Sequence, residues 1–413
     1  MTTSRNLPLD GVRVLDLGRF VAAPFAAQML GDLGAEVIKI EKPETGDDIR
    51  GYGPPFLTAQ DGSIESSYDF VAMNRNKKSI CIDIRTPEGA ALIRDLAREA
   101  DILIENFRAG HLARYGLGYE DLRKEAPQLI YCSISGFGQT GPYSQRPGLD
   151  SIFQAMSGHM SISGEPDGPP TKTGVYFCDL AAGLYSAFGI LGALRSREVC
   201  GGSGQHLDMS LLSTSISLLA AHGQKYLATG TVPGRTGAKT PGNAPSGLYR
   251  CADGEFLFSA GSDPQFATLA KLLGEPDMAS DPRFATRAAR VQNIAALDEW
   301  MLGHFMTKPR DHWIEAFIAE GLMAAPVYSL DETFDDPHVR QSGVTVSVDH
   351  PNAGPTEILT SPLRFSETPL TDYASPPVLG QNGPEILKSW LGKSDDEIEG
   401  LSRDGAVWLQ KPR

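Results

Sequence analysis

One acidic residue, Asp179, precedes a short stretch of residues with very small side chains. Three small residues, Ala181, Ala182 and Gly183, follow it within an apolar run that predicts a helix. Backbone N–H groups at the start of a helix favour a carboxylate and any oxyanion that forms beside it. The small residues leave room for a bulky substrate to approach. Asp179 is therefore a candidate catalytic residue, and the alternative is that it only caps the helix.

A glycine-rich loop at residues 136–141, Gly-Phe-Gly-Gln-Thr-Gly, matches the pattern G-x-G-x-x-G and follows a predicted strand. A dinucleotide-binding loop must open a helix, so that the helix N-terminus meets the pyrophosphate. Here Pro142 and Pro147 follow and disfavour a helix, and the pattern comes late in the chain. The loop therefore argues against a nicotinamide or flavin site, although its backbone can approach some ligand closely.

Basic residues cluster in the first part of the chain, and several follow predicted strand ends, where open α/β sheets bind their ligands. In the segment Asn106, Phe107 and Arg108, an amide, an aromatic ring and a guanidinium could together hold a purine nucleotide. The alternatives are an ordinary solvated face for the charges and a core position for Phe107. The basic residues are Lys39, Lys42, Arg50, Arg75, Lys77, Lys78, Arg85, Arg108, Arg114 and Arg146.

Composition and spacing disfavour several classes of function. The net charge of −14 argues against sequence-independent nucleic-acid binding, which needs Lys and Arg to neutralise phosphates. The chain has neither a Ser-His-Asp order nor a G-x-S-x-G elbow, which disfavours a serine hydrolase. The eight histidines lack H-x-x-x-H spacing, so no metal site is predicted.

The cysteines and apolar segments predict a soluble protein of the cytoplasm. The five cysteines are scattered with no C-x-x-C pair, a pattern typical of reduced intracellular thiols. The first residues, Met-Thr-Thr-Ser-Arg-Asn, lack the apolar core of a signal peptide, and no apolar run of membrane-spanning length is expected elsewhere. We therefore expect neither a membrane nor a nucleic acid among the partners.

The elements that must position these residues alternate between strand and helix in the first third of the chain. Strands are predicted at 12–17, 36–40, 79–84, 101–105 and 129–135, with helices at 22–33 and 86–99. This alternation favours a largely parallel sheet covered by helices. Three further helices at 150–158, 179–197 and 211–227 and a strand at 206–209 come next.

The composition changes at residues 229–246, where Gly and Pro predict a linker or a functional loop. A smaller α+β domain is predicted beyond it from the segments 256–260, 266–273, 289–305 and 312–320. Short strands and proline-rich turns return from residue 345, and a helix is expected at 384–391. Because 413 residues exceed one compact core, two domains are expected.

Taken together, the chain resembles the class III CoA-transferases, the family of formyl-CoA transferase and carnitine CoA-transferase, over nearly its full length. Within that family it looks closest to the succinate–hydroxymethylglutarate CoA-transferase branch. The ordered segments that carry the resemblance are LDGVRVLDL at 9–17, GAEVIKIE at 34–41, NRNKKS at 74–79, ENF at 105–107 and SGFGQTGP at 135–142.

The resemblance implies that Asp179 is a nucleophile. Its carboxylate would attack a donor thioester, giving a mixed anhydride and CoA thiolate, and the thiolate would then form an enzyme–CoA thioester. An acceptor carboxylate would reverse these steps, with no metal or permanently bound cofactor. The expected function is thus CoA transfer from an acyl-CoA such as succinyl-CoA to a small carboxylic or dicarboxylic acid.

The resemblance also implies which residues contact CoA. Among them, the basic residues suit phosphate groups. The implied CoA-binding residues are Val21, Ala22, Lys42, Ile82, Arg85, Asn106, Phe107, Arg108, Arg114 and Asp150.

The implied fold is a Rossmann-like large domain built from both chain ends, with a small α+β middle domain. We place the large domain at residues 1–225 and 336–413, and the small domain with its linkers at 226–335. In this family two chains interlock as linked rings, so a homodimer is expected.

Two departures from the family bear on the function. Racemases on this fold carry a catalytic histidine where this chain has Leu149, which disfavours racemisation. Many relatives show proline–tyrosine where this chain has Pro245 and Ser246, which puts the acyl substrate in doubt. Two alternatives therefore stay open, an acyl-CoA racemase or epimerase and a non-catalytic CoA-binding subunit. Candidates for gripping the acid, from charge and position alone, are Arg235, Lys239 and Asn243.

Overall fold

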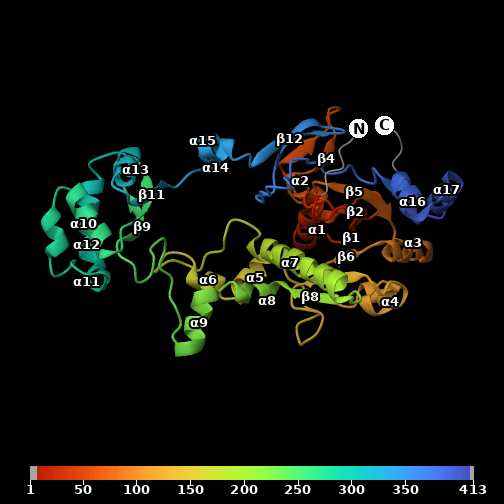
Figure 1. The fold of residues 1–413 in the computed structure, drawn as a ribbon, viewed down its shortest axis with the longest axis horizontal. Coiled ribbons are helices and arrows are strands. Elements are labelled where there is room, and N and C mark those ends of the chain that lie inside the picture. The colour runs from red at the N-terminus through yellow and green to blue at the C-terminus, as the bar shows by residue number, and fades with distance from the viewer. Residues whose placement is uncertain (1–6, 410–413) are drawn as a thin grey trace. The chain divides into compact units, whose positions relative to one another are not determined.

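The computed structural model describes residues 7–409, which divide into two compact units (Figure 1). As far as the ranges are described, the larger unit comprises Met1–His159, Lys172–Thr229 and Ser342–Arg413. The smaller unit comprises Met160–Thr171 and Gly230–Gln341. The sequence analysis placed its boundaries after residues 225 and 335 and left the short segment 160–171 with the larger domain. Each unit is described by itself.

A seven-stranded sheet forms the centre of the larger unit, in the order β14-β5-β2-β1-β6-β7-β8. All neighbouring strands pair in parallel except β14, which is antiparallel to β5. From β1 the chain proceeds to β2 and β5 on one side, and β6, β7 and β8 lie on the other. The order therefore reverses between β1 and β6, a switch point of the kind beside which open α/β sheets bind ligands. The strands are β1 (Arg13–Asp16), β2 (Glu36–Glu41), β5 (Lys77–Ile82), β6 (Ile102–Glu105), β7 (Ile130–Ser135), β8 (His206–Ser210) and β14 (Val407–Trp408).

Alternating side chains of the strands build two cores, one on each face of the sheet. Val14 and Ile104 belong to one core, whereas Leu15 and Leu103, their neighbours along the chain, belong to the other. The first core is closed by α1 (Ala22–Asp32), α5 (Asp150–Met156), α7 (Phe177–Cys200) and α8 (Leu211–Ser217). The second is closed by α3 (Pro87–Glu99), α4 (Tyr119–Glu125), α16 (Gly383–Leu391) and α17 (Asp395–Arg403).

Most of these elements begin and end close to the predicted residues, and α3 begins as predicted: Thr86 Oγ1 accepts from Gly89 N at 3.0 Å, with Pro87 at the first helical position. The single helix predicted at 211–227 is wrong. The chain forms α8 and then α9 (Ala220–Thr229), because it turns at residues 218–219 and enters α9 through Ala220, whose positive φ of 44° is incompatible with a helix that continues from α8.

Further short elements complete the larger unit. They are η1 (Asp48–Gly51), β3 (Phe56–Thr58), β4 (Ile64–Ser67), α2 (Tyr68–Met73), η2 (Leu112–Tyr115), β12 (Thr345–His350) and β13 (Gly354–Leu359), while α6 (His159–Ile162) starts at its boundary.

Helix α7 is long and apolar enough to cross a membrane by length and composition, with 24 residues and an 18-residue stretch of mean hydropathy 1.6. The expectation that no apolar run reaches this length is therefore wrong for α7. Half of the apolar stretch is buried, and Ala182 and Ile190 belong to the core on the α1 face of the sheet. A core helix passes the same test, so length and composition do not decide the matter.

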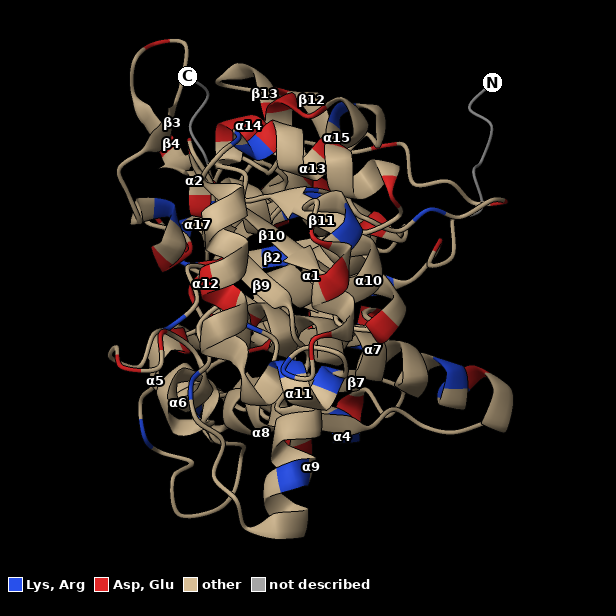
Figure 2. Cartoon of the chain, turned by 90° about the vertical axis from the view of Figure 1, so that its left-hand side faces the viewer, with Lys and Arg blue, Asp and Glu red and all other residues tan. Residues whose placement is uncertain are grey.

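The smaller unit has an antiparallel sheet in the order β11-β10-β9 and a cluster of helices. Its core is aromatic: Phe258 stacks on Phe317 with ring centroids 5.0 Å apart, and Phe256 meets Phe305 edge-on at 5.1 Å. Figure 2 shows that its helices carry charged residues of both signs, basic on α11 and acidic on α12. The elements are β9 (Ser246–Arg250), β10 (Glu255–Ser259), β11 (Met323–Pro326), α10 (Asp263–Leu272), η3 (Pro276–Ser280), α11 (Arg287–Gln292), α12 (Ile294–Phe305), α13 (Arg310–Ala319), α14 (Leu330–Asp335) and α15 (Pro337–Gln341).

Candidate functional site

Asp179 lies in the first turn of α7, but it does not cap the helix. The capping position belongs to Tyr176, whose side chain makes no capping hydrogen bond. The cap comes instead from Asp150 at the start of α5, whose Oδ1 accepts from Cys178 N at 2.7 Å and from Asp179 N at 3.2 Å. The alternative that Asp179 serves only as an N-cap is therefore wrong, and its carboxylate is left for other chemistry.

Asp150 is itself held in place. Gln154, one turn later on α5 and buried, donates from Nε2 to Asp150 Oδ2 at 2.5 Å. Gln154 Oε1 in turn accepts from Thr173 N at 2.9 Å, on the segment that leads into α7. This chain of bonds fixes the start of α7 against α5, so that both carboxylates keep their relative positions.

The surroundings of Asp179 raise its pKa to about 7, first because burial disfavours the charged form and second because the Asp150 carboxylate lies close by. A carboxylate with this pKa is ionised in part at neutral pH and is more basic than an ordinary aspartate. The neighbouring Cys178 thiol is not a competing nucleophile, because burial raises its pKa to about 11.

The small residues after Asp179 serve packing rather than substrate access. Ala181, Ala182 and Gly183 are buried, and a Cβ placed on Gly183 would lie 2.9 Å from Ala22 O and 3.0 Å from the Phe25 ring. The expectation that they leave room for substrate is therefore wrong. They let α7 approach α1 closely, which brings the start of α1 beside the start of α7.

A cavity of about 500 Å³ opens beside Asp179 within the larger unit. Arg108, Arg146 and Lys172 also line it, and none of the three has an ion-pair partner among residues 7–409. An anion entering this cavity would therefore meet cations that need not give up a carboxylate first. The sequence-predicted residues that line it are Val21, Ala22, Asn106, Phe107, Arg108, Asp150 and Asp179.

A second cavity of about 430 Å³ lies beyond the carboxyl ends of β1, β2, β5 and β6. Its cations are already paired: Lys42 Nζ lies 2.5 Å from Asp48 Oδ1, and Arg85 binds Asp83 at 2.7 Å. The predicted residues that line it are Lys42, Ile82, Arg85 and Phe107. Arg114, also predicted, lines neither cavity.

Arg19 lines both cavities and was missed by the sequence analysis. Its guanidinium lies 4.6 Å from the centroid of the Phe107 ring and pairs with Asp48 at 3.1 Å. A usable signal existed, because Arg19 follows β1 just as Arg108 follows β6, and ligands gather at these strand ends.

The glycine-rich loop contributes to the first cavity through Gly136. A Cβ on Gly136 or Gly148 would lie 2.6 Å or 2.2 Å from the Phe153 ring of α5, so glycine is required there by close approach. The next helix begins only at Asp150, in line with the prediction that this loop does not open a helix directly.

The three residues proposed to grip the acid are engaged inside the smaller unit. Arg235 donates to the backbone carbonyls of residues 165, 166 and 168, the last at 2.6 Å. Lys239 pairs with Asp298, and Asn243 Nδ2 donates to Ser259 Oγ at 3.3 Å. Their role in binding substrate stays a prediction.

Among the described residues, no group of His, Cys, Asp and Glu side chains could hold a metal ion. The five cysteines are free thiols in the structure.

Comparisons with known proteins agree on one family. The sequence pattern of CoA-transferase family III matches residues 9–383. The chain is 42% identical to succinate–glutarate CoA-transferase of Agrobacterium fabrum, over 93% of this chain and 96% of that one. It is 39% identical to succinyl-CoA:glutarate CoA-transferase of Mus musculus, over 97% and 90%.

A solved structure agrees with the fold. A crystal structure of a CaiB/BaiF family protein from Brucella suis is 43% identical and superposes with a TM-score of 0.84, covering 92% of this chain and 98% of that one. The family resemblance stated from the sequence is confirmed, and the α/β fold with its mainly parallel sheet matches that structure. The chain belongs to CoA-transferase family III.

Proposed function

We propose that this protein transfers CoA from an acyl-CoA donor, such as succinyl-CoA, to a small dicarboxylic acid. Family membership and relatives named for succinate and glutarate support the reaction class. The observation that carries the proposal is the Asp179 carboxylate, which does not cap its helix and has a raised pKa. It shares its cavity with three cations that have no ion-pair partner within residues 7–409.

In the proposed mechanism, Asp179 attacks the thioester carbonyl of the donor. The C–S bond breaks, leaving an acyl–aspartyl anhydride and the CoA thiolate. The thiolate then attacks the aspartyl carbonyl, the donor acid leaves as a carboxylate, and Asp179 carries CoA as a thioester. The acceptor carboxylate attacks this thioester, and the thiolate attacks the acyl carbon of the second anhydride, which frees Asp179. Water must stay out, because it would hydrolyse either intermediate.

We place the nucleotide part of CoA in the second cavity and the thioester end in the first. Lys42 and Arg85 would meet phosphates there, and Phe107, which lines both cavities, would contact the chain between them. The arrangement fits the rule that open α/β sheets bind ligands beside their switch point.

A dicarboxylic acceptor suits the charge of the first cavity. One carboxylate must reach Asp179 to react, and the other needs a cation to compensate its burial. Arg108, Arg146 and Lys172 can supply it. Arg235, Lys239 and Asn243 remain candidates from the sequence, and their Ala variants are expected to raise the acceptor KM with little effect on CoA.

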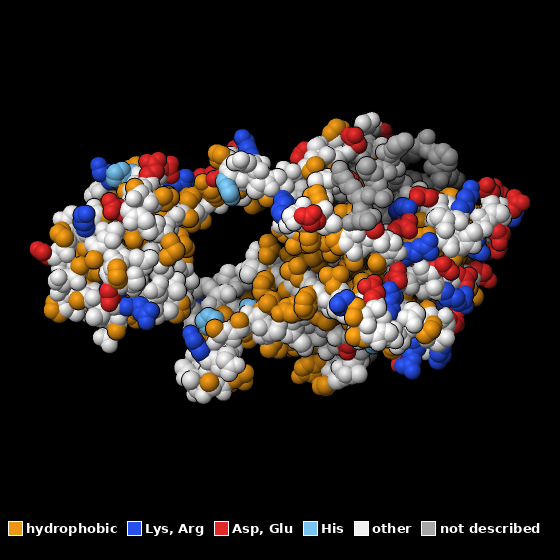
Figure 3. All heavy atoms as spheres, viewed as in Figure 1, with side chains coloured by type: hydrophobic (Ala, Val, Ile, Leu, Met, Phe, Trp, Pro, Cys, Tyr) orange, Lys and Arg blue, Asp and Glu red, His pale blue; other side chains and the backbone are white. Residues whose placement is uncertain are grey.

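A homodimer of the interlocked type is proposed as well. Side chains on α7 are apolar and open to solvent in the single chain, with Phe188 74% and Leu184 54% exposed (Figure 3). Helix α9 buries none of its residues, and Leu227 is 77% exposed. An apolar surface of this kind is typical of an interface. Sedimentation equilibrium should give a dimer mass, and a monomer at micromolar concentration would contradict the proposal.

The reaction is tested by incubating the protein with succinyl-CoA and a panel of carboxylic acids, with mass detection of the acyl-CoA products. Hydroxylamine added during turnover should convert the Asp179 side chain to a hydroxamate, found by peptide mass analysis. Binding of CoA with no adduct at Asp179 would favour a non-catalytic subunit. Deuterium uptake at the α-carbon of an acyl-CoA, without any acceptor, would favour a racemase.

A further inference from the structure

A three-residue loop, Gly18 to Phe20, follows β1, and side chains from other segments hold its backbone. Gly18 N donates to Asp16 Oδ1 at 2.8 Å, and Gly18 O accepts from Lys39 Nζ at 2.8 Å. Asp16 and Lys39 are completely buried. Buried side chains of β1 and β2 thus fix the backbone at the start of this loop.

Asn106 holds the next peptide group from across the switch point. Its Oδ1 accepts from Arg19 N at 2.8 Å and its Nδ2 donates to Arg19 O at 2.7 Å. Asn106 directly follows β6, so this pair of bonds joins the ends of β1 and β6 where the strand order reverses. The amide side chain is oriented by both bonds, and an ionised carboxylate could not make both because it has no donor.

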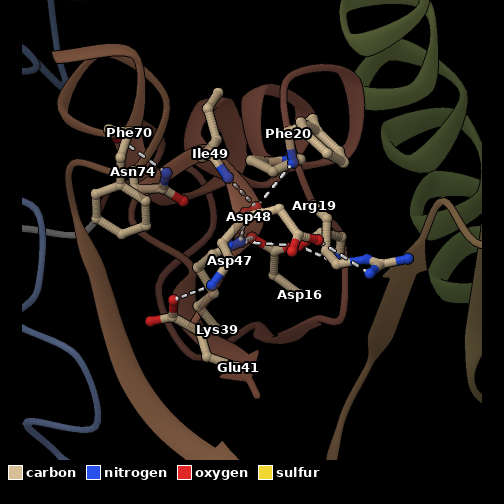
Figure 4. Close-up of polar contacts among 12 residues, drawn as sticks. Asp16, Arg19, Phe20, Lys39, Glu41, Asp47, Asp48, Ile49, Phe70 and Asn74 are labelled. Atoms are coloured by element: carbon tan, nitrogen blue, oxygen red, sulfur yellow. Dashed lines mark hydrogen bonds and ion pairs between the residues drawn. The ribbon is translucent and has the colours of Figure 1, made fainter. Parts of the chain in front are cut away.

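Asp47 holds the third residue. Its Oδ1 accepts from Phe20 N at 3.1 Å and from Ile49 N at 3.1 Å, and its Oδ2 pairs with Lys39 Nζ at 2.9 Å (Figure 4). Phe20 has a φ of 62°, in the left-handed region that costs a non-glycine residue roughly 1 kcal/mol or more. Asp47 is 2% exposed, so this strained residue is tied to a buried anion.

The buried charges are costly to keep, which suggests that the loop's geometry matters. Lys39 meets Asp47 and also Asp16, at 3.7 Å, and Lys77 meets Asp16 at 2.8 Å. Desolvating such ions costs several kcal/mol each, and apolar residues of the same size in their place often give a core that is equally stable or more stable. These charged side chains do, however, supply hydrogen-bond acceptors and donors in fixed positions for the backbone of the loop.

The loop of residues 18–20 forms a wall that the two cavities share. Arg19 lines both, Gly18 lines the second, and Phe20 lines the first. The Arg19 guanidinium covers the Phe107 ring, and Phe107 also lines both cavities. A ligand long enough to occupy both cavities must pass this wall.

We propose that Asn106 and Asp47 are positioning residues for acyl-CoA: they hold the backbone of residues 18–20 so that Arg19 and Phe20 form the wall along which the CoA chain runs. Asn106 thus acts through the peptide groups of Arg19 that it holds. The inference rests on the proposed function, because it assumes that CoA spans both cavities.

Two single-atom exchanges test it. Asn106→Asp places a carboxylate oxygen against Arg19 O, and Asp47→Asn removes the charge that faces Lys39. The loss of one such buried bond is expected to raise the Kd for CoA, measured by titration calorimetry, and the acyl-CoA KM about tenfold. The acceptor KM should change less than the Kd for CoA, because the cations proposed to bind the acid, Arg108, Arg146 and Lys172, lie outside this loop.

Asp32→Asn is the matched control. It breaks a buried ion pair of the same kind, Asp32 with Arg75 at 2.5 Å, whose residues line neither cavity. This variant should lower the Tm and leave the Kd for CoA unchanged. An unchanged Kd in Asn106→Asp and Asp47→Asn, or a Kd that rises in all three variants together with their loss of Tm, would overturn the inference. If Asp47→Asn does not fold, Asn106→Asp decides. Wild-type protein that binds no CoA would instead remove the proposed function.

Discussion

The two cavities of the larger unit differ in whether the cations that line only one of them are paired with carboxylates; Arg19, which lines both, is paired with Asp48. In the first, Arg108, Arg146 and Lys172 have no ion-pair partner within residues 7–409, whereas in the second Lys42 and Arg85 are paired with aspartates. An anion gains the full attraction of an unpaired cation, but it must displace a carboxylate from a paired one. We therefore expect the first cavity to decide which acid reacts and the second to adjust CoA affinity by small amounts.

The largest effect should come from the nucleophile of the first cavity. Asp179→Asn is expected to lower kcat at least about 1000-fold, because both covalent intermediates need the carboxylate. The measurement is CoA exchange between succinyl-CoA and labelled succinate, with the Asn side chain verified by mass.

Stability provides the control for that variant. The pKa of Asp179 is raised in the folded state, from an ordinary value of 3.8 to about 7, so the folded protein binds the proton more tightly than the unfolded chain. Ionisation of Asp179 therefore destabilises the fold as pH rises through about 4 to 7. The Tm of Asp179→Asn relative to the parent should increase between pH 5 and pH 8. If Asp179→Asn is inactive but also less stable than the parent at pH 8, the lost activity could come from unfolding and would not support Asp179 as the nucleophile.

Next in size are the unpaired cations. Lys172→Gln and Arg146→Gln are each expected to raise the KM for a dicarboxylate acceptor about tenfold, since a hydrogen bond to a charged group is lost. The KM for a monocarboxylate of the same length should change little. Lys172→Arg keeps the charge and Arg123→Gln removes a surface cation on α4, so both serve as controls. Equal effects on both acids would contradict an acceptor role.

The pH dependence should separate Asp179 from another buried carboxyl. Activity is expected to rise with pH through about 7, because the nucleophile must be ionised. In Asp150→Asn the neighbouring charge is gone, which lowers the pKa of Asp179 and moves the profile to lower pH. Burial also raises the pKa of Glu105 to about 7. A profile that shifts in Glu105→Gln but not in Asp150→Asn would assign the titration to Glu105 instead.

The smallest effect concerns the paired cations of the second cavity. Asp83→Asn frees Arg85 from its carboxylate and is expected to lower the Kd for CoA about threefold, while Arg85→Gln should raise it by a similar factor. Raising the salt concentration should reduce both differences. If Asp83→Asn weakens CoA binding, the ion pair with Asp83 does not limit the attraction of Arg85 for CoA. The contrast drawn between the two cavities would then be wrong.

The sheet could be predicted from the sequence because its signals are local. Apolar β-branched runs separated by amphipathic helices identify parallel strands, and the pattern Thr86-Pro87 identifies the start of α3. The break between α8 and α9 could not be predicted, because an apolar run continues through it and only the left-handed Ala220 interrupts the helix. The assignment of residues 160–171 to the smaller unit depends on contacts distant in sequence.

The site was predicted in its residue types rather than in its contacts. Asp179 was found because an acidic residue before an apolar helix is visible in one line of sequence. That Asp150 caps the helix, and that Gly183 serves the approach of α1, depends on segments that meet only in the folded chain. The role of Asn106 could not be predicted for the same reason. The sequence shows an amide side chain after a strand, but not the Arg19 peptide groups that this amide binds.

The edge of the sheet beside β5 is completed only by the far end of the chain. Strand β14 pairs with β5, and α16 packs over the same side, yet more than three hundred residues separate β5 from β14. During synthesis the first strands therefore leave the ribosome with a hydrogen-bonding edge uncovered while the whole smaller unit is still being made. A chain truncated near residue 380 lacks this cover and should therefore depend on chaperones to stay in solution. It would still contain every residue that lines the two cavities.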